Sequence, residues 1–233
     1  MVFALYLMLR HRAQNRMLLI ASYVFYAAWD WRFLGLMIFS TMVSYWAALR
    51  METGAEPQRR QMLTITLIVC LGILGIFKYL GFFSESMITL LAGFHIEADL
   101  FFTNIILTVG ISFYTFQTLS YTIDVYRREI KPCDNFQDFA LYVAFFPALV
   151  AGPIERAKNL LPQITAPRVV TWDGLARGAE LCLLGLIKKM VIADGISPSV
   201  DAVYGAPDPS GAAILIATWL FAIQIYCDFS GYT

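Results

Sequence analysis

The chain has 233 residues, of which 59% are hydrophobic and 15% are charged, and its formal net charge is zero. Soluble domains usually carry about 25% charged residues, so this composition indicates a polytopic helical membrane protein of the all-α class. The apolar runs are continuous rather than alternating, which excludes membrane β-strands. There is no basic face or tail to suggest nucleic-acid binding.

The N-terminal third contains three apolar runs. Met1–Leu9 is about half the length of a membrane span, and a basic cluster, Arg10–Arg16, follows it. Met17–Trp29 and Phe33–Leu49 are the second and third runs. Trp and Tyr favour the membrane–water interface, so the aromatic turn Trp29–Arg32 predicts a membrane-surface hairpin between them.

The clearest full-length span is Met62–Phe83, which follows a polar loop, Arg50–Arg60. Lys78 lies near the far end of this span. Its ammonium group either snorkels to the interface or faces a polar interior. The next segment, Ser84–Leu100, contains acidic residues and His95 but no Lys or Arg.

The segment Phe101–Tyr126 is long and uneven, because Gly110 and several polar side chains interrupt it. Its polar face should turn away from lipid, either to line a cavity or to form hydrogen bonds with neighbouring helices. Asp124 is either an intramembrane acid or an interfacial carboxylate paired with Arg127 or Arg128. The polar residues are Ser112, Tyr114, Gln117, Thr118, Ser120, Tyr121 and Thr122.

The stretch Asn135–Arg156 differs from the other apolar segments in its length and its prolines. Its uncharged part, Phe139–Gly152, would form roughly 20 Å of helix, short of the ~30 Å hydrocarbon core. This predicts a re-entrant helical hairpin over residues 136–156, whose freed backbone groups need neighbouring helices or a polar cavity. The alternative is a kinked helix that faces lipid. The residues that would shape the hairpin are Pro147, Gly152, Pro153, Glu155 and Arg156.

The C-terminal third begins with an interfacial loop, Ala157–Val170, that contains one amphipathic turn. Thr171 is the predicted N-cap of a helix that runs to about Asp194. A loop over Ile196–Ser210 and a last span, Ala212–Phe229, follow.

Three features of this third predict contacts inside a helix bundle. Gly174 and Gly178 have the spacing that permits close approach of another helix. Lys188 and Lys189 lie in an apolar stretch, so they either reach the interface or at least one meets an anionic group inside the bundle. Asp228 either caps the last span or orients a group further along the chain.

Nearly all Lys and Arg of the loops lie in four segments. If residues 136–156 enter and leave on the same side, all four segments fall on the cytoplasmic side, so the positive-inside rule supports the re-entrant interpretation. The chain then crosses the membrane about seven times. The four segments are Arg10–Arg16, Arg50–Arg60, Arg127–Lys131 and Arg156–Arg177.

The sequence contains no nucleotide, dinucleotide or zinc-protease motif. Neither His11 nor His95 lies in a membrane segment, and the cysteines are far apart without ligand spacing, so we expect no metal site and no bound cofactor. The four cysteines are Cys70, Cys133, Cys182 and Cys227.

Six stretches carry a resemblance to a known family. FALYVAFFPALVAGPIER (Phe139–Arg156) resembles the signature of the bacterial membrane-bound O-acyltransferases, in the branch of the alginate O-acetylase subunit. Other stretches match in the expected order, so the resemblance covers nearly the whole chain. They are FYAAWDWRF (Phe25–Phe33), GIFKY (Gly75–Tyr79), GISFYTFQTLSYTIDVYR (Gly110–Arg127), GLIKKMVIAD (Gly185–Asp194) and IYCDFSGYT (Ile225–Thr233).

The resemblance implies an enzyme that moves an acyl group, acetyl in this branch, from a cytoplasmic thioester such as acetyl-coenzyme A toward hydroxyls of an exported polysaccharide such as alginate. It implies a multi-pass protein of the bacterial inner membrane with periplasmic acyltransferase partners. The alternative activity that the resemblance allows is D-alanyl transfer to teichoic acid. A membrane transporter or flippase is the alternative from another class, but the internal repeat that it would require is not found.

The resemblance also assigns roles. The family uses an intramembrane histidine as general base, and it lies beyond the stretch that ends at Thr233. We therefore expect residues 1–233 to be the N-terminal part of one acyltransferase domain, inactive without that histidine. Arg156 is the candidate contact for the anionic donor, with a structural Glu155–Arg156 pair as the alternative. The candidates for lining a tunnel are Ser112, Tyr114, Gln117 and Asp228.

Overall fold

The structure is a computed structural model that describes residues 2–92, 110–149 and 152–233, so His95 lies outside the described residues. Two compact units make up the chain: Met1–Val150 with Ile154–Arg168, and Ala151–Pro153 with Val169–Thr233. The described residues contain helices and turns but no strand, which confirms the all-α prediction. A single domain over residues 1–233 stays a prediction.

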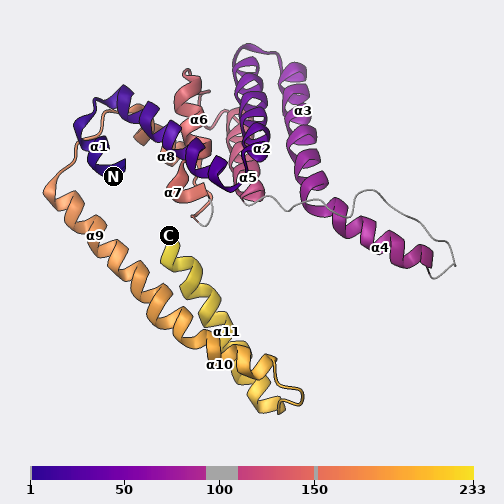
Figure 1. The fold of residues 1–233 in the computed structure, drawn as a ribbon. Helices are drawn as coiled ribbons and strands as arrows, with labels where there is room; N and C mark the ends of the chain where they lie inside the picture. Colours follow the sequence, from indigo (N-terminus) through magenta and orange to yellow (C-terminus); the bar gives the residue numbers. More distant parts are fainter. Residues whose placement is uncertain (1, 93–109, 150–151) are drawn as a thin grey trace. The chain divides into compact units, whose positions relative to one another are not determined.

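The N-terminal unit is built from helices that pack around α2 (Figure 1). Helices α2, α3 and α5 lie side by side, and α6 contacts α2, α5 and α8. The elements of this unit are α1 (Val2–Met8), α2 (His11–Thr53), α3 (Glu56–Leu74), the π-helix η1 (Gly75–Tyr79), α4 (Leu80–Ala92), α5 (Ile111–Tyr126), α6 (Phe136–Ala144), α7 (Phe146–Leu149) and α8 (Ala157–Thr165).

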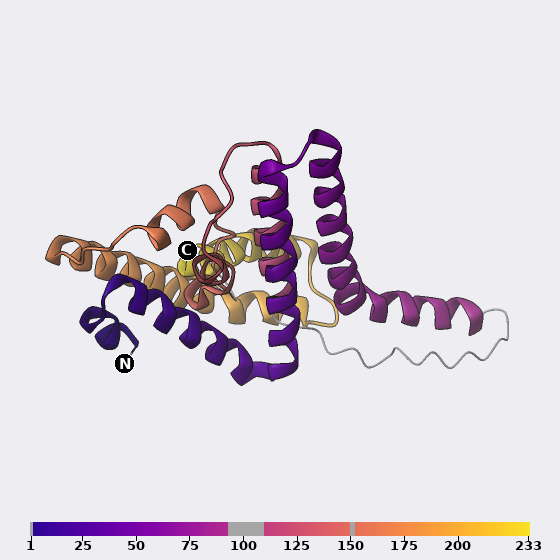
Figure 2. The ribbon, with the colours of Figure 1, turned by 90° about the horizontal axis from the view of Figure 1, so that it is seen from above.

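Helix α2 bends sharply at Asp30, where a hairpin was predicted (Figure 2). Asp30 alone leaves the helical region, with φ −159° and ψ 113°. Its carboxylate accepts a hydrogen bond from the backbone N–H of Arg32 at 2.9 Å and pairs with the Arg32 guanidinium at 2.6 Å. Asp30 therefore caps the second arm of the helix, so a kink replaces the predicted hairpin.

The predicted span Met62–Phe83 lies within the continuous run α3–η1–α4, and the loop before it is shorter than predicted. Only Gly54 and Ala55 separate α2 from α3. The chain has three helices long and apolar enough to cross a membrane among its described residues, and the total of about seven crossings stays a prediction. These three are His11–Thr53, Glu56–Leu91 and Gly211–Tyr232.

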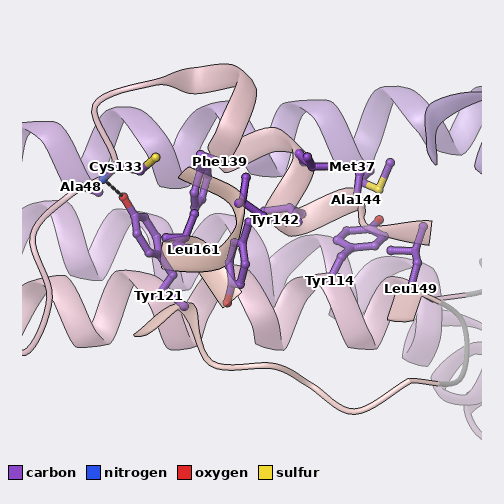
Figure 3. Packing of buried hydrophobic residues seen from close by; sticks show 14 of the residues in the cluster. Met37, Ala48, Tyr114, Tyr121, Cys133, Phe139, Tyr142, Ala144, Leu149 and Leu161 are labelled. Atoms are coloured by element: carbon purple, nitrogen blue, oxygen red, sulfur yellow. Dashed lines mark hydrogen bonds between the residues drawn. The ribbon is translucent and has the colours of Figure 1, made fainter. Parts of the chain in front are cut away.

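The core of the N-terminal unit lies where α5 and α6 meet α2 (Figure 3). Tyr114, Tyr121, Phe139 and Tyr142 each have 0% exposure. The rings of Tyr121 and Phe139 lie 4.4 Å apart between centroids, a packed aromatic contact. This confirms that the polar face of α5 turns inward.

Helix α8 replaces the interfacial loop predicted over Ala157–Val170, and it extends the predicted amphipathic turn to nine residues. Ala157, Leu161 and Ile164 are buried at helical spacing on one face. The remaining residues of that range are extended or bent.

The C-terminal unit contains α9 (Trp172–Leu186), the π-helix η2 (Ile187–Ala193), α10 (Asp194–Tyr204) and α11 (Gly211–Tyr232). The predicted cap is confirmed, because Thr171 Oγ1 accepts a hydrogen bond from Gly174 N at 3.1 Å. The predicted last span is confirmed as α11.

The loop predicted over Ile196–Ser210 is wrong for most of its length, because helix α10 continues to Tyr204 despite Pro198. Val200 is 1% exposed, and the Tyr204 ring lies edge-on to Phe221 at 6.0 Å. Packing of α10 on α11 therefore outweighs the helix-breaking tendency of the proline.

The close helix approach predicted at Gly174 and Gly178 occurs elsewhere. A Cβ on Gly178 would meet nothing within 4 Å, and one on Gly174 would meet only its own cap residue. A Cβ on Gly185 would instead lie 2.5 Å from the carbonyl oxygen of Gly231. Helices α9 and α11 therefore touch through this second glycine pair.

Candidate functional site

The predicted re-entrant segment is a short, broken helix buried inside the N-terminal unit. Helix α6 begins at its N-cap Asn135 and ends at Ala144, and Phe145 leaves the helical region with φ −56° and ψ 101°. Pro147 explains the break, because it has no N–H and its ring would clash with the preceding turn. All residues of Phe139–Ala144 are at most 1% exposed, which contradicts the alternative of a lipid-facing helix. Entry and exit on the same membrane side stay a prediction.

Side chains from α2 and α5 satisfy the backbone groups around this break. Gln117 Nε2 donates to the Tyr142 carbonyl at 2.8 Å, and Phe146 N donates to Ser22 Oγ at 3.2 Å. The Tyr142 hydroxyl donates to the Glu155 carbonyl at 2.9 Å. Irregular backbone at membrane depth needs such partners. The sequence analysis missed the role of Ser22, because it lies 124 positions away from Phe146.

Gly110 helps to position the other end of the broken segment. It precedes α5 with a positive φ of 77°, a conformation that glycine adopts without strain. A Cβ there would lie 3.1 Å from the Leu149 carbonyl of α7. Glycine thus permits α7 to approach the start of α5.

The tunnel-lining candidates of α5 contact neighbouring helices. Ser112 Oγ accepts from Lys78 Nζ at 3.4 Å, so Lys78 reaches a polar group of the unit. Tyr114 packs edge-on against Tyr26 with 6.4 Å between ring centroids. Gln117 binds the α6 backbone. These contacts fit the helix-to-helix interpretation, and a tunnel lined by these residues stays a prediction.

Asp124 is buried at 6% exposure, and its position relative to the membrane surface stays a prediction. No pairing with Arg127 or Arg128 is present among the described residues, where Arg127 instead lies 4.0 Å from Glu129. Asp124 Oδ2 has no hydrogen-bond partner in the described part of the chain.

A groove of about 790 Å³ opens in the N-terminal unit where α2, α6 and α8 begin. We call it the basic groove, because five of its lining residues are Lys, Arg or His and two are acidic. The basic residues are His11, Arg12, Arg16, Lys131 and Lys158, and the acidic residues are Asp134 and Asp138.

A polar network holds the walls of the basic groove together. Asn15 Nδ2 donates to Asp138 Oδ1 at 2.8 Å and to the Ile164 carbonyl at 3.0 Å. The Arg168 guanidinium donates to Asn15 Oδ1. Asn15 is 5% exposed, so one buried amide ties α2 to α6 and α8. The sequence analysis missed this residue, since nothing local distinguishes Asn15 from other polar residues of the basic cluster.

Arg156 is the N-cap residue of α8 and is exposed. It precedes the groove residues Ala157 and Lys158 but does not itself line the groove. Neither Arg156 nor Glu155 takes part in an ion pair among the described residues. The donor contact assigned to Arg156 stays a prediction.

The C-terminal unit contains a second polar cluster, between η2 and α11. Lys189 Nζ lies 2.8 Å from Asp194 Oδ1 and 2.6 Å from Asp228 Oδ1, and Lys188 Nζ donates to Ser230 Oγ at 2.8 Å. Lys189 thus meets two anionic groups, as one alternative predicted, and a location of these pairs inside the bundle stays a prediction. Asp228 pairs with Lys189, a role that the sequence analysis missed.

Comparison with known proteins shows which of them the chain resembles. No family model matches it. It is 40% identical to the probable alginate O-acetylase of Azotobacter vinelandii over 98% of this chain and 46% of that protein. The chain is a relative of the alginate O-acetylases. The corresponding Pseudomonas aeruginosa protein is 38% identical over 98% of this chain and 44% of its own length.

The chain is also similar to a protein whose name gives peptidoglycan, rather than alginate, as the acceptor. The peptidoglycan O-acetyltransferase of Helicobacter pylori is 30% identical over 92% of this chain and 45% of that protein. The chain thus spans about half the length of the curated relatives that it matches.

Four of the six stretches that resemble the alginate O-acetylase branch contain irregular parts of the helices. FYAAWDWRF surrounds the kink at Asp30, and GIFKY is the π-helix η1. FALYVAFFPALVAGPIER contains the break between α6 and α7, and GLIKKMVIAD contains η2. Irregular turns of this kind are frequent at functional sites. The other two stretches lie mainly in the regular helices α5 and α11.

Proposed function

We propose that the chain is part of a membrane-bound O-acyltransferase that moves an acetyl group from a cytoplasmic thioester to hydroxyls of an exported polysaccharide. The observation that carries this proposal is the 40% identity with a probable alginate O-acetylase over 98% of the chain. The long apolar helices of the chain support a membrane protein.

In such a reaction the hydroxyl oxygen attacks the thioester carbonyl, a general base takes the hydroxyl proton and the thiolate leaves. The residues described here would contribute by positioning. Gln117 and Ser22 hold the broken helix α6–α7 through its backbone, so its shape does not depend on water. A fixed, water-poor segment lowers the barrier by orienting the reactants and excluding hydrolysis.

The site of action would be the bacterial inner membrane, with acetyl-coenzyme A or another acyl thioester as the donor. Periplasmic acyltransferase partners would complete delivery to the polymer. Alginate is the first acceptor to test, because the relatives at 37–40% identity that span 98% of this chain carry that name. The peptidoglycan relative makes a peptidoglycan acceptor the second candidate.

A segment exchange tests the proposal. The stretch of the A. vinelandii protein that matches this chain is replaced by residues 1–233, and the chimera is expressed in an alginate-producing strain without its own acetylase. We expect acetyl esters on the secreted alginate, measured by proton nuclear magnetic resonance. The matched control exchanges the same stretch with that of the P. aeruginosa protein, which is 38% identical to this chain.

If the control chimera acetylates alginate and this chimera, present in the membrane at equal abundance, does not, the alginate assignment is wrong. Acetylated peptidoglycan would then assign the second acceptor. Esterified D-alanine on teichoic acid in a Gram-positive host would assign the D-alanyl alternative.

A further inference from the structure

The basic groove holds a net excess of positive charge among its lining residues. Arg12, Arg16, Lys131 and Lys158 line it, and none of the four takes part in an ion pair among the described residues. The two carboxylates of the groove, Asp134 and Asp138, offset only part of this charge, since four cations face two anions. Single exposed lysines and arginines are ordinary on a surface, but here four converge on one concave site.

Three helices direct their N-terminal ends at the same groove. The first turns of α2, α6 and α8 contribute His11, Gln137 and Lys158 to its lining. The N-termini of α2 and α8 have no side-chain cap. Uncapped backbone N–H groups carry partial positive charge and are ready donors to anions.

We propose that the basic groove is a binding site for a phosphate group. A volume of about 790 Å³ exceeds one phosphate and suits a phosphate-bearing molecule. Two sources carry this chemistry on the cytoplasmic side: the headgroup of an anionic lipid, and the phosphates of a coenzyme A thioester. The coenzyme A source rests on the proposed function, whereas the lipid source does not.

Binding to the full gene product in neutral detergent tests the proposal. One arm titrates coenzyme A by calorimetry, and the other titrates phosphatidylglycerol by native mass spectrometry, with phosphatidylcholine as the uncharged comparison. The groove variant is Arg12→Gln/Arg16→Gln/Lys158→Gln. Its matched control, Arg50→Gln/Arg60→Gln/Arg127→Gln, removes three cations of the same predicted face outside the groove.

We expect at least one of the two ligands to bind, and the groove variant to bind it at least about tenfold more weakly than the control variant. The affinity should also fall with added salt. If only coenzyme A binds, the occupant of the groove is the acyl donor. If only phosphatidylglycerol binds, the occupant is an anionic lipid. The proposal is overturned if neither ligand binds better than phosphatidylcholine, or if the two variants bind equally.

Size-exclusion profiles and melting temperatures exclude misfolding of the variants, and Lys158→Gln alone serves if the triple variant does not fold. Acetylation of polysaccharide is measured separately by the segment exchange. Failure of the proposed function would therefore leave the binding result interpretable.

Discussion

The two units of the chain stabilise their polar groups in different ways. In the N-terminal unit, buried polar side chains of α5 form hydrogen bonds to backbone groups of their own helix, as Thr122 does, or of another helix, as Gln117 does with Tyr142. In the C-terminal unit α9 has no buried residue, and residues such as Leu181, at 68% exposure, remain outside. Its polar cluster between η2 and α11 includes charges that pair with each other, as Lys189 does with Asp228.

This difference separates two kinds of stability. A buried hydrogen-bond network is sensitive to the loss of any member, because the remaining partner stays desolvated. A partly exposed ion pair is less sensitive, because solvent screens it and can replace it. The C-terminal unit instead depends on close contact of its helices at Gly185 and Gly231.

The largest expected effect is at this glycine contact. Gly185→Ala should destabilise the protein by about 1–3 kcal/mol, because the added Cβ would lie 2.5 Å from a backbone oxygen of α11. Gly178→Ala is the matched control in the same helix, where the Cβ meets nothing. Thermal unfolding in detergent measures both, and equal melting temperatures would refute the contact.

In the N-terminal unit, Gln117→Leu should cost about 1–3 kcal/mol, because the Tyr142 carbonyl would stay buried without its donor. Gln163→Leu is the control, since Gln163 forms an exposed bond within its own helix. Denaturant titration of each variant measures the difference. A Gln117 variant as stable as the Gln163 variant would show that the α5–α6 bond does not contribute.

A smaller effect is expected at the lysine cluster. Asp228→Asn should lower the melting temperature less than Gly185→Ala does, because its pair with Lys189 is partly exposed. Added salt should reduce the difference in melting temperature between this variant and the unaltered protein, because salt screens the ion pair. A loss larger than that of Gly185→Ala would mean that this cluster, rather than the glycine contact, holds α9 to α11.

The smallest effect is one of reactivity rather than stability. Burial raises the pKa of the Cys133 thiol, so less of the reactive thiolate is present at a given pH. N-ethylmaleimide should therefore modify exposed Cys182 before Cys133 in the folded protein. Mass spectrometry of tryptic peptides measures the two rates, and unfolding should remove the difference. Equal rates in the folded state would contradict the burial of Cys133.

The features that the sequence predicted correctly depend on local pattern. The cap at Thr171, the span in α11 and the inward polar face of α5 follow from spacing along one segment. The break near Pro147 follows from the chemistry of a single residue. These predictions need no knowledge of which helices meet.

The features that were missed depend on contacts between distant residues. Helix α10 continues past Pro198 because it packs on α11, and the glycine contact requires Gly231 opposite Gly185. The basic groove forms only when α2, α6 and α8 come together through Asn15. At Asp30 the sequence predicted a hairpin, but not the kink that the Asp30 carboxylate caps.

The support of α6 by both α2 and α5 has a consequence for how the chain is made. Ser22 emerges from the ribosome 124 residues before Phe146, which it binds. At 5–20 residues per second this interval is about 6 to 25 s. During it the Ser22 hydroxyl lacks its α7 partner, so α2 is made before α6 and α7 can settle against it. The broken helix and α8, whose Leu161 and Ile164 also belong to the core, are therefore the last parts of the N-terminal core to be completed.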